Sequence, residues 1–210
     1  MYVEFPYITG ENPNGKYGEL LAEKMFSCIK GLSRIKKICE LGCGNGYFAG
    51  RLGRAGYEVT AIDCSETGIA YAEKNHGKYT RFIRSEISPS LTQGLKTQFD
   101  LVFSIDVIEH LYCPSDLIKT AGALLKPQGY LLVSTPYHGF LKYLAMSLTN
   151  RMDAHLNPLY EGGHIKFFSV KTLSKLISSD GFDEVEFEFL GRFPWLWKNM
   201  ICLAKKSGQR

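Results

Sequence analysis

The chain has 210 residues and a mass of 23.6 kDa, with 45% hydrophobic and 22% charged residues, and these values fit one globular domain. The formal net charge of +4 is spread along the chain without a dense basic cluster, so we expect no nucleic-acid partner. No apolar run approaches the ~20 residues that span a bilayer, and residues 1–10 lack a signal-peptide pattern, so we expect a cytoplasmic protein without stable membrane insertion.

The first expected element is a helix near the N-terminus. Apolar residues recur at helical spacing between Tyr17 and Ile29, which predicts an amphipathic helix. The segment before it is rich in aromatic residues and in turn formers such as Asn12-Pro13-Asn14-Gly15. We therefore predict that residues 1–35 form an N-terminal lid segment and helix.

The next stretch, Ile38–Asp63, combines an apolar run, a glycine turn, a short helical run and a second apolar run that ends in an acid. Gly42, Gly44 and Gly46 alternate at the turn, where the backbone can take positive φ and lie against a ligand without a Cβ in the way. Asp63 ends the second predicted strand, where its carboxylate can accept hydrogen bonds from ribose hydroxyls. This pattern is half of a nucleotide-binding α/β unit.

The glycine spacing distinguishes between two kinds of cofactor. A dinucleotide fingerprint runs G-x-G-x-x-G and holds a pyrophosphate at a helix N-terminus, whereas this chain has G-x-G-x-G with Tyr47 as the next residue. Glu40, two residues before the first glycine, would put a carboxylate close to any phosphate. Both features favour a cationic ligand, and an NAD(P)-dependent oxidoreductase is kept as an alternative.

Beyond residue 63, short apolar runs continue to alternate with helical runs as far as Tyr137. The runs that predict strands are residues 36–41, 57–62, 80–83, 99–104 and 130–134. Strands that alternate with helices form a mainly parallel sheet, buried on both faces through right-handed crossovers. We predict a Rossmann-like, doubly wound α/β domain over residues 36–206, with an insertion at about 137–169.

The stretch Glu40-Leu41-Gly42-Cys43-Gly44-Asn45-Gly46 resembles motif I of class I S-adenosylmethionine (SAM) methyltransferases, whose pattern is acid-x-G-x-G-x-G. Within that family the chain is similar to the ubiquinone-biosynthesis O-methyltransferase-like group, through residues 99–110, 124–127 and 129–136. The resemblance implies seven strands in the order 3-2-1-4-5-7-6, with the last strand, Met200–Ala204, reversed. It also implies SAM as the cofactor and a small-molecule methyl acceptor.

The resemblance implies one set of SAM contacts, which lie in or after predicted strands and are Glu40, Gly42, Gly44, Gly46, Asp63, Glu86, Ile87, Ile105 and Asp106. The glycines would pack against the methionyl part of SAM, and Glu40 would lie near its ammonium group. Asp63 would accept hydrogen bonds from both ribose hydroxyls, and Glu86 from the adenine amino group. Ile105 and Asp106 would open the cleft beside the reactive methyl group.

Histidine has the right pKa to remove the proton of an acceptor hydroxyl. His110, His138, His155 and His164 follow the fourth and fifth predicted strands, on the edge where open α/β sheets bind ligands. His164 is the first candidate for a catalytic base because Gly162-Gly163 before it allows a turn, and His110 is the second. The alternative for each is a structural histidine that fixes the local chain by hydrogen bonds.

A divalent metal is another use of the same positions. Asp106, Glu109 and His110 would share one face of a helical turn and could bind a cation that holds an acceptor oxygen. Some members of the ubiquinone-type group have acid-x-x-Glu-His at this place. The position after the fifth strand that would supply an amide ligand is Tyr137, and this departure argues against the metal.

Aromatic residues concentrate in the N-terminal segment, the insertion and the last hairpin, which cover the acceptor pocket in the family. We expect Tyr7, Tyr137, His138 and His164 to contact a small apolar or ring-bearing acceptor, methylated at a hydroxyl oxygen. The apolar run Phe140–Leu148 has Lys142 as its only basic residue, which gives little support for a membrane-surface role. A nitrogen acceptor, a nucleic-acid or protein methyltransferase and a non-catalytic SAM-binding scaffold stay open as alternatives.

Overall fold

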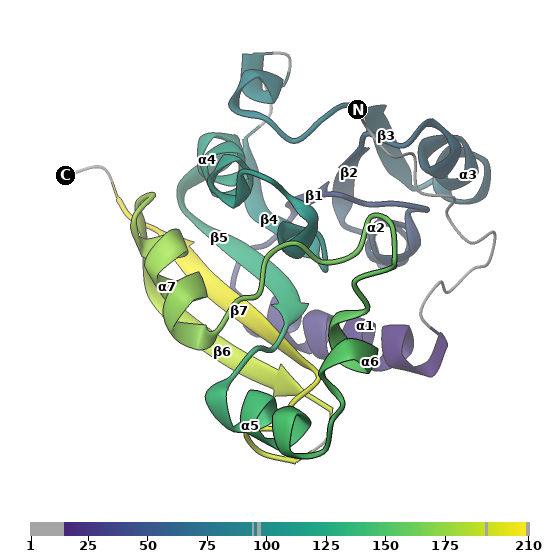
Figure 1. Ribbon diagram of the computed structural model, residues 1–210. Helices are drawn as coiled ribbons and strands as arrows, with labels where there is room; N and C mark the ends of the chain where they lie inside the picture. The colour runs from purple at the N-terminus through teal and green to yellow at the C-terminus, as the bar shows by residue number, and fades with distance from the viewer. Residues whose placement is uncertain (1–14, 94, 96–97, 192, 209–210) are drawn as a thin grey trace.

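The computed structural model describes residues 15–93, 95, 98–191 and 193–208, so Tyr7 and the expected lid segment before residue 15 lie outside the described residues. The chain forms a seven-stranded sheet in the order β3-β2-β1-β4-β5-β7-β6 (Figure 1). Strand β7 is antiparallel to both of its neighbours, and the other pairs are parallel. This arrangement confirms the predicted fold class, the strand order and the reversed last strand.

The strands are β1 (Lys37–Leu41), β2 (Glu58–Asp63), β3 (Thr80–Arg84), β4 (Phe99–Ile105), β5 (Leu125–Pro136), β6 (Phe182–Leu190) and β7 (Asn199–Lys206). The α-helices are α1 (Gly15–Gly31), α2 (Tyr47–Arg54), α3 (Glu66–His76), α4 (Pro114–Leu124), α5 (Phe140–Leu148), α6 (Met152–Leu156) and α7 (Val170–Ser178). Two 3-10 turns, η1 (Pro89–Gln93) and η2 (Ile108–His110), flank β4. None of the described helices is both long and apolar enough to cross a bilayer.

Helices cover both faces of the sheet, and the alternation of side chains along the strands assigns each helix to a face. Leu101 and Phe103 of β4 pack in one core with buried residues of α1, α2 and α3. Val102, between them in sequence, packs in the other core with buried residues of α4 and α7. Because β1, β4 and the carboxyl half of β5 are buried on both faces, most of their residues are apolar.

Strand β5 begins earlier than the pattern predicts. The register with β4 shifts between Phe99 and Leu101, and Gln128 opposite this shift has a φ of 63°. A bulge of this kind lets the polar segment at residues 126–129 continue the strand although its sequence is typical of a turn. The carboxyl end of β5, which carries the site residues, is where the pattern placed it.

Helix α1 belongs to the core of the sheet, because Leu21, Ala22 and Met25 have no exposed surface and pack with β1, β4 and α2. The insertion between β5 and α7 contains α5 and α6 and passes back over the ends of the central strands (Figure 1). The division into a lid segment over 1–35 and a SAM-binding domain over 36–206 stays a prediction.

Candidate functional site

The glycine turn after β1 needs glycine at two positions, each with a positive φ and each packed against a different neighbour. Gly42 has a φ of 81°, and a Cβ there would lie 2.4 Å from a methyl group of Val107. Gly46 has a φ of 77°, and a Cβ there would lie 2.8 Å from Ala72 and Phe82. At these two positions the backbone therefore lies so close to its neighbours that no residue larger than glycine fits.

Two buried acids lie beside this turn, and backbone amides hold both. Asp63 accepts hydrogen bonds from the backbone N–H of Gly44 at 2.7 Å and of Ser65 at 2.8 Å. The Glu40 carboxylate accepts from the Ala49 N–H at 3.0 Å at the start of α2. Burial raises the pKa of Glu40 well above its ordinary value, against the opposing effect of this hydrogen bond.

The other predicted SAM contacts lie along the same edge. The Ser85 N–H donates to the Asp63 carbonyl at 2.9 Å, which holds the loop after β3 beside the end of β2. In that loop Glu86 is exposed, and Ile87 packs partly against the core. Ile105, at the end of β4, is 7% exposed. We call the ends of β1, β2 and β3, with the glycine turn, the cofactor half of the site.

A second cluster is built around Glu109, which is fully buried in η2. The Thr135 hydroxyl donates to Glu109 Oε2 at 3.0 Å. The backbone N–H groups of Ile165 and Lys166 donate to the Glu109 carbonyl at 2.9 and 3.0 Å. These bonds fix the insertion to the end of β4 and place His164 Nε2 4.0 Å from Glu109 Oε1.

His110 completes this cluster. Its ring centroid lies 4.9 Å from that of His164, with the two rings nearly perpendicular. His110 Nδ1 lies 3.0 Å from the carbonyl oxygen of Gly162, and since a carbonyl only accepts, Nδ1 carries the proton. The structure therefore brings together the two histidines that the sequence singled out as candidate catalytic groups.

The protonation states of this cluster follow from burial. Burial raises the pKa of Glu109 well above its ordinary value, and the charge of Asp106 adds to this effect. Burial lowers the pKa of His164 to about 4, and the charges of His110, His155 and Lys142 lower it further. Because the pKa of His164 is about 4, its ring is neutral at neutral pH, so its 4.0 Å contact with Glu109 is not an ion pair.

Glu109, His110 and His164 could also hold a metal ion, because one ligand-type atom from each lies within 4.8 Å of the others. This set differs from the alternative metal set that the sequence offered, which has Asp106 in place of His164. Asp106 is not part of this set; its Oδ1 accepts from the Ser134 hydroxyl and from the Asn199 side-chain amide, both at 2.7 Å. The predicted helical turn that would have aligned Asp106 with Glu109 is a short 3-10 turn that begins at Ile108.

Asp106 is instead the centre of a third group, which sequence reasoning missed. Asp106 has a φ of 51°, and burial raises the pKa of its carboxyl group against the hydrogen bonds from Ser134 and Asn199. The Tyr17 hydroxyl interacts with Asn199 and Asp106, and the ammonium group of Lys198 lies 3.6 Å from the centre of the Tyr17 ring. No local pattern marks Asn199, since it meets Asp106 only once β7 is placed beside β5.

Two predicted substrate contacts lie beyond these clusters. Tyr137 is 8% exposed, and its ring packs edge-on against Phe189 and Trp197. His138 is 4% exposed and shares a 2.8 Å hydrogen bond between its Nδ1 and the Tyr143 hydroxyl. Burial lowers the pKa of His138 to about 3, so this histidine is neutral at ordinary pH. We call the ends of β4 and β5, the start of β7 and the insertion the acceptor half of the site.

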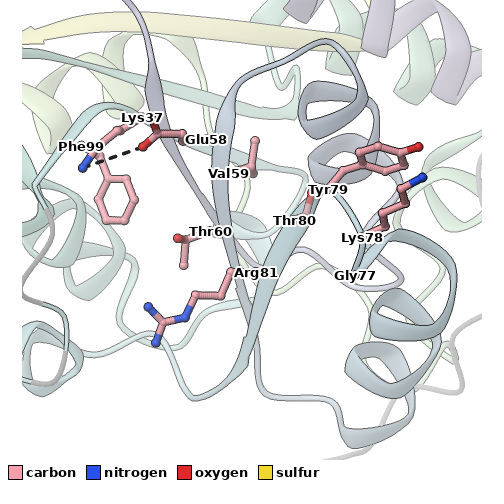
Figure 2. Close-up of a pocket in the computed structure, with 10 residues that line it drawn as sticks. All are labelled: Lys37, Glu58, Val59, Thr60, Gly77, Lys78, Tyr79, Thr80, Arg81 and Phe99. Atoms are coloured by element: carbon pink, nitrogen blue, oxygen red, sulfur yellow. Dashed lines mark ion pairs between the residues drawn. The ribbon is translucent and has the colours of Figure 1, made fainter.

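A hollow of about 600 Å³ lies at the opposite edge of the sheet (Figure 2). It is lined by residues at the amino ends of the first strands, including Lys37 of β1, Glu58 of β2 and Arg81 of β3. Lys37 and Glu58 form an ion pair at 3.8 Å, marked in Figure 2. Since parallel α/β sheets bind ligands at the carboxyl ends of their strands, this hollow is not the candidate site.

Comparisons with known proteins identify the family of this chain. A family model described as a methyltransferase domain matches residues 15–186. A ubiquinone biosynthesis O-methyltransferase of Caulobacter vibrioides is 34% identical over 112 residues, which cover 52% of this chain and 44% of that protein. A protein of the same name from Coxiella burnetii is 29% identical over 149 residues, which cover 70% of this chain and 63% of that protein.

The solved structure of a Synechocystis magnesium protoporphyrin IX methyltransferase with bound SAH shares the fold, with a TM-score of 0.67 at 18% identity. The similarity covers 94% of this chain and 86% of that one. The match to the two curated relatives, by contrast, spans less than two thirds of their own length.

Proposed function

Because the chain belongs to the SAM-dependent methyltransferase family, we propose that it transfers a methyl group from SAM to a hydroxyl oxygen of a small molecule. The observation that carries the proposal is the cluster of buried Glu109, half-buried His110 and solvent-accessible His164 on the carboxyl edge of the sheet. A neutral histidine on that edge can take the proton that a hydroxyl must lose. The family also decides between the two cofactors that the glycine turn allowed, in favour of SAM.

In this proposal the cofactor half binds SAM. The glycine turn, through Gly42, Gly44 and Gly46, lies against the methionyl part, and Asp63 accepts from the ribose hydroxyls. Asp63 is positioned for this because two backbone amides already fix its carboxylate. The remaining proposed contacts are Glu40 at the ammonium group, Glu86 and Ile87 at the adenine, and Ile105 and Asp106 near the methyl group.

SAM, when bound, supplies an electrophilic methyl group on a sulfonium. The chain orients the acceptor oxygen in line with that methyl group and keeps water out, which in favourable cases supplies on the order of 7–11 kcal/mol of the barrier reduction. His164 would receive the proton that the acceptor hydroxyl loses, at a ring nitrogen, as that oxygen is methylated. His110 and Glu109 hold His164 in place.

The acceptor we propose is a ring-bearing hydroxyl compound. The names of the curated relatives, ubiquinone biosynthesis O-methyltransferases, support a phenol, and a sugar hydroxyl is the next choice. Tyr7, Tyr137 and His138 would line the approach, with His138 closest to the insertion. A cytoplasmic location also stays a prediction.

The first test is calorimetric titration of the purified chain with S-adenosylhomocysteine (SAH), with NADH as the control ligand. We expect micromolar binding of SAH, and Asp63→Ala should weaken it by about 1–3 kcal/mol because its removal strands buried hydrogen-bond donors. The acceptor is then sought with paired phenols, catechols and amines, each with Mg²⁺ or EDTA. Binding of SAH without turnover of any compound would support the non-catalytic scaffold alternative. Turnover of amines alone would mean that the methyl acceptor is a nitrogen atom and not an oxygen atom.

A further inference from the structure

The Asp106 carboxylate has one oxygen that is fixed by hydrogen bonds and one that is not. Its Oδ1 accepts from the Ser134 hydroxyl and from the Asn199 side-chain amide, both at 2.7 Å. Among the residues that the structure describes, none donates a hydrogen bond to Oδ2 and no cationic side chain forms an ion pair with this carboxylate. Both oxygens of an ionised carboxylate can accept, so Oδ2 keeps its capacity to interact with a ligand.

Asp106 lies where the end of β4 meets the glycine turn. The chain turns sharply at this residue, whose φ is 51°, and its N–H donates to the Ser134 carbonyl at 3.1 Å. The next residue, Val107, lies against the glycine turn, since a Cβ on Gly42 would be 2.4 Å from a Val107 methyl group. Asp106 is thus adjacent in the chain to the residue that packs on the turn assigned, in the proposed function, to the methionyl part of SAM.

The described residues leave the charge of Asp106 without a bonded counter-charge. The ammonium group of Lys198 lies over the Tyr17 ring, 3.6 Å from its centre. Burial raises the pKa of Asp106, and the two hydrogen bonds to Oδ1 and the charges of His110 and Lys198 offset this effect only in part. Glu109 is fully buried, and the Asp106 charge adds to the effect of burial in raising its pKa. A partly buried carboxylate in such surroundings favours a ligand that brings a positive charge.

We propose that Asp106 discriminates between SAM and SAH, because its Oδ2 attracts the positive charge of the sulfonium group that only SAM carries. The inference rests on the proposed function, which assigns the cofactor half to SAM. SAM and SAH differ by one methyl group and one positive charge, so contacts with the adenine, the ribose and the amino-acid part are common to both. A carboxylate near the sulfur acts on the charge difference alone. Once the acceptor is methylated, the sulfur is neutral, so Asp106 no longer favours the bound ligand and SAH can exchange for SAM.

The substitution Asp106→Asn removes this charge and changes little else. Both donors bond to Oδ1, so the asparagine side chain keeps that oxygen in place and puts an amino group where Oδ2 lies. Asparagine also adopts a φ near 51° more readily than most residues other than glycine. Asp106→Gly is a second variant, because glycine takes this φ without strain and has no carboxylate.

Calorimetric titration of the full chain with SAM and with SAH tests the inference. We expect Asp106→Asn to lower the affinity for SAM by about tenfold or more and the affinity for SAH by less than about threefold, because only SAM carries the charge. Sinefungin, a SAM analogue with a protonated amine in place of the methylated sulfur, should lose affinity as SAM does. Asp63→Asn is the matched control: the ribose is the same in both ligands, so this variant should weaken SAM and SAH by equal factors.

Equal loss of SAM and SAH affinity in Asp106→Asn, or no loss of either, refutes the inference. Unchanged binding of sinefungin also refutes it, in favour of a contact with the methyl group. If Asp106→Asn does not fold, the same titrations with Asp106→Gly decide. Failure of the wild-type protein to bind either SAM or SAH would overturn the proposed function and this inference with it. Binding of both ligands with an unchanged ratio of affinities in the variant counts against the inference alone.

Discussion

The cofactor half and the acceptor half are held together in different ways, although they share one edge of the sheet. In the cofactor half, backbone amides hold the acids: Gly44 and Ser65 donate to Asp63, and Ala49 donates to Glu40. In the acceptor half, contacts join segments far apart in the chain. Asn199 donates to Asp106 across 93 positions, and His110 bonds to Gly162 across 52.

Because of this difference, the two halves should tolerate different substitutions. Backbone amides are present whatever the side chain, so the cofactor half depends on φ angles and on the absence of Cβ atoms. Side-chain contacts between distant segments can change one at a time without disturbing the turn after β1. We therefore expect substitutions in the two halves to affect different measured quantities, SAH affinity in one and turnover in the other.

The largest effect should come from Gly42→Ala in the cofactor half. The added Cβ would lie 2.4 Å from Val107 in a residue with a φ of 81°. A strained backbone and an overpacked contact together cost several kcal/mol, so we expect SAH affinity to fall on the order of 10²-fold or more. Gly31→Ala is the matched control, because no atom lies within 4 Å of its added Cβ. Calorimetric titration of both variants checks this, and equal affinities would mean that the turn does not contact SAH.

His164→Ala should give the next largest effect, on turnover alone. Removal of a general base lowers the rate by about 10²–10⁴-fold, whereas the cofactor half is untouched. Lys166→Ala is a suitable control because it keeps the backbone N–H that donates to the Glu109 carbonyl. Initial rates with an identified acceptor, measured alongside SAH affinity, separate the two halves. Full activity of the His164 variant would remove this histidine from the chemistry.

Acid should lower the free energy of unfolding through His138. Burial lowers the pKa of this histidine to about 3. Unfolded histidine takes up its proton near pH 6.5, while folded His138 does so only near pH 3, so the unfolded state binds more protons between these values. The stability due to His138 is therefore complete above pH 6.5 and falls as the pH drops, by at most about 1.4 kcal/mol per pH unit.

The curve for His138→Asn isolates this contribution, because Glu40 and Glu109 titrate alike in both proteins. We expect the free energy of unfolding, measured by denaturant titration from pH 7.5 to 4, to fall less steeply in the variant. Parallel curves for the two proteins would show that His138 is protonated in the folded state as readily as in the unfolded one.

The features that define the cofactor half are local in the sequence, so its turn and strands could be predicted, while its contacts with SAM stay a prediction. The glycine turn, the acid at the end of β2 and the alternation of strands with helices all lie within short windows. The strand order came from the family resemblance rather than from periodicity, and the structure confirms it.

The acceptor half could be predicted only in part. The sequence singled out His110 and His164, but it grouped Asp106 with Glu109 and His110 by helical spacing, and the turn there is a 3-10 turn that excludes Asp106. The role of Asn199 as a partner of Asp106 depends on the pairing of β7 with β5. The inward orientation of Lys142 depends on a carbonyl group outside its helix. Each of these contacts depends on tertiary placement, which no local pattern encodes.

Tyr17→Phe should give the smallest effect. It also tests to which half Tyr17 belongs, because Tyr17 lies in α1 and interacts with Asn199 and Asp106 of the acceptor half. Burial raises the pKa of its hydroxyl group, the Asp106 charge adds to this, and the Asn199 hydrogen bond opposes it, so the phenol stays protonated. Phenylalanine keeps the ring under the Lys198 ammonium group and removes only the hydroxyl. Loss of one such hydrogen bond, worth about 0.5–1.5 kcal/mol, should slow turnover by about two- to tenfold and leave SAH affinity unchanged.

Tyr71→Phe, on α3 of the cofactor half, is the matched control for this substitution. If Tyr17→Phe weakens SAH binding and leaves turnover per bound cofactor intact, Tyr17 belongs to the cofactor half. In that case α1 would cover SAM, and Asp106 would serve both halves of the site. If turnover falls alone, α1 reaches past the glycine turn to the acceptor, and the N-terminal helix is part of the acceptor half although it is the element most distant from it in sequence.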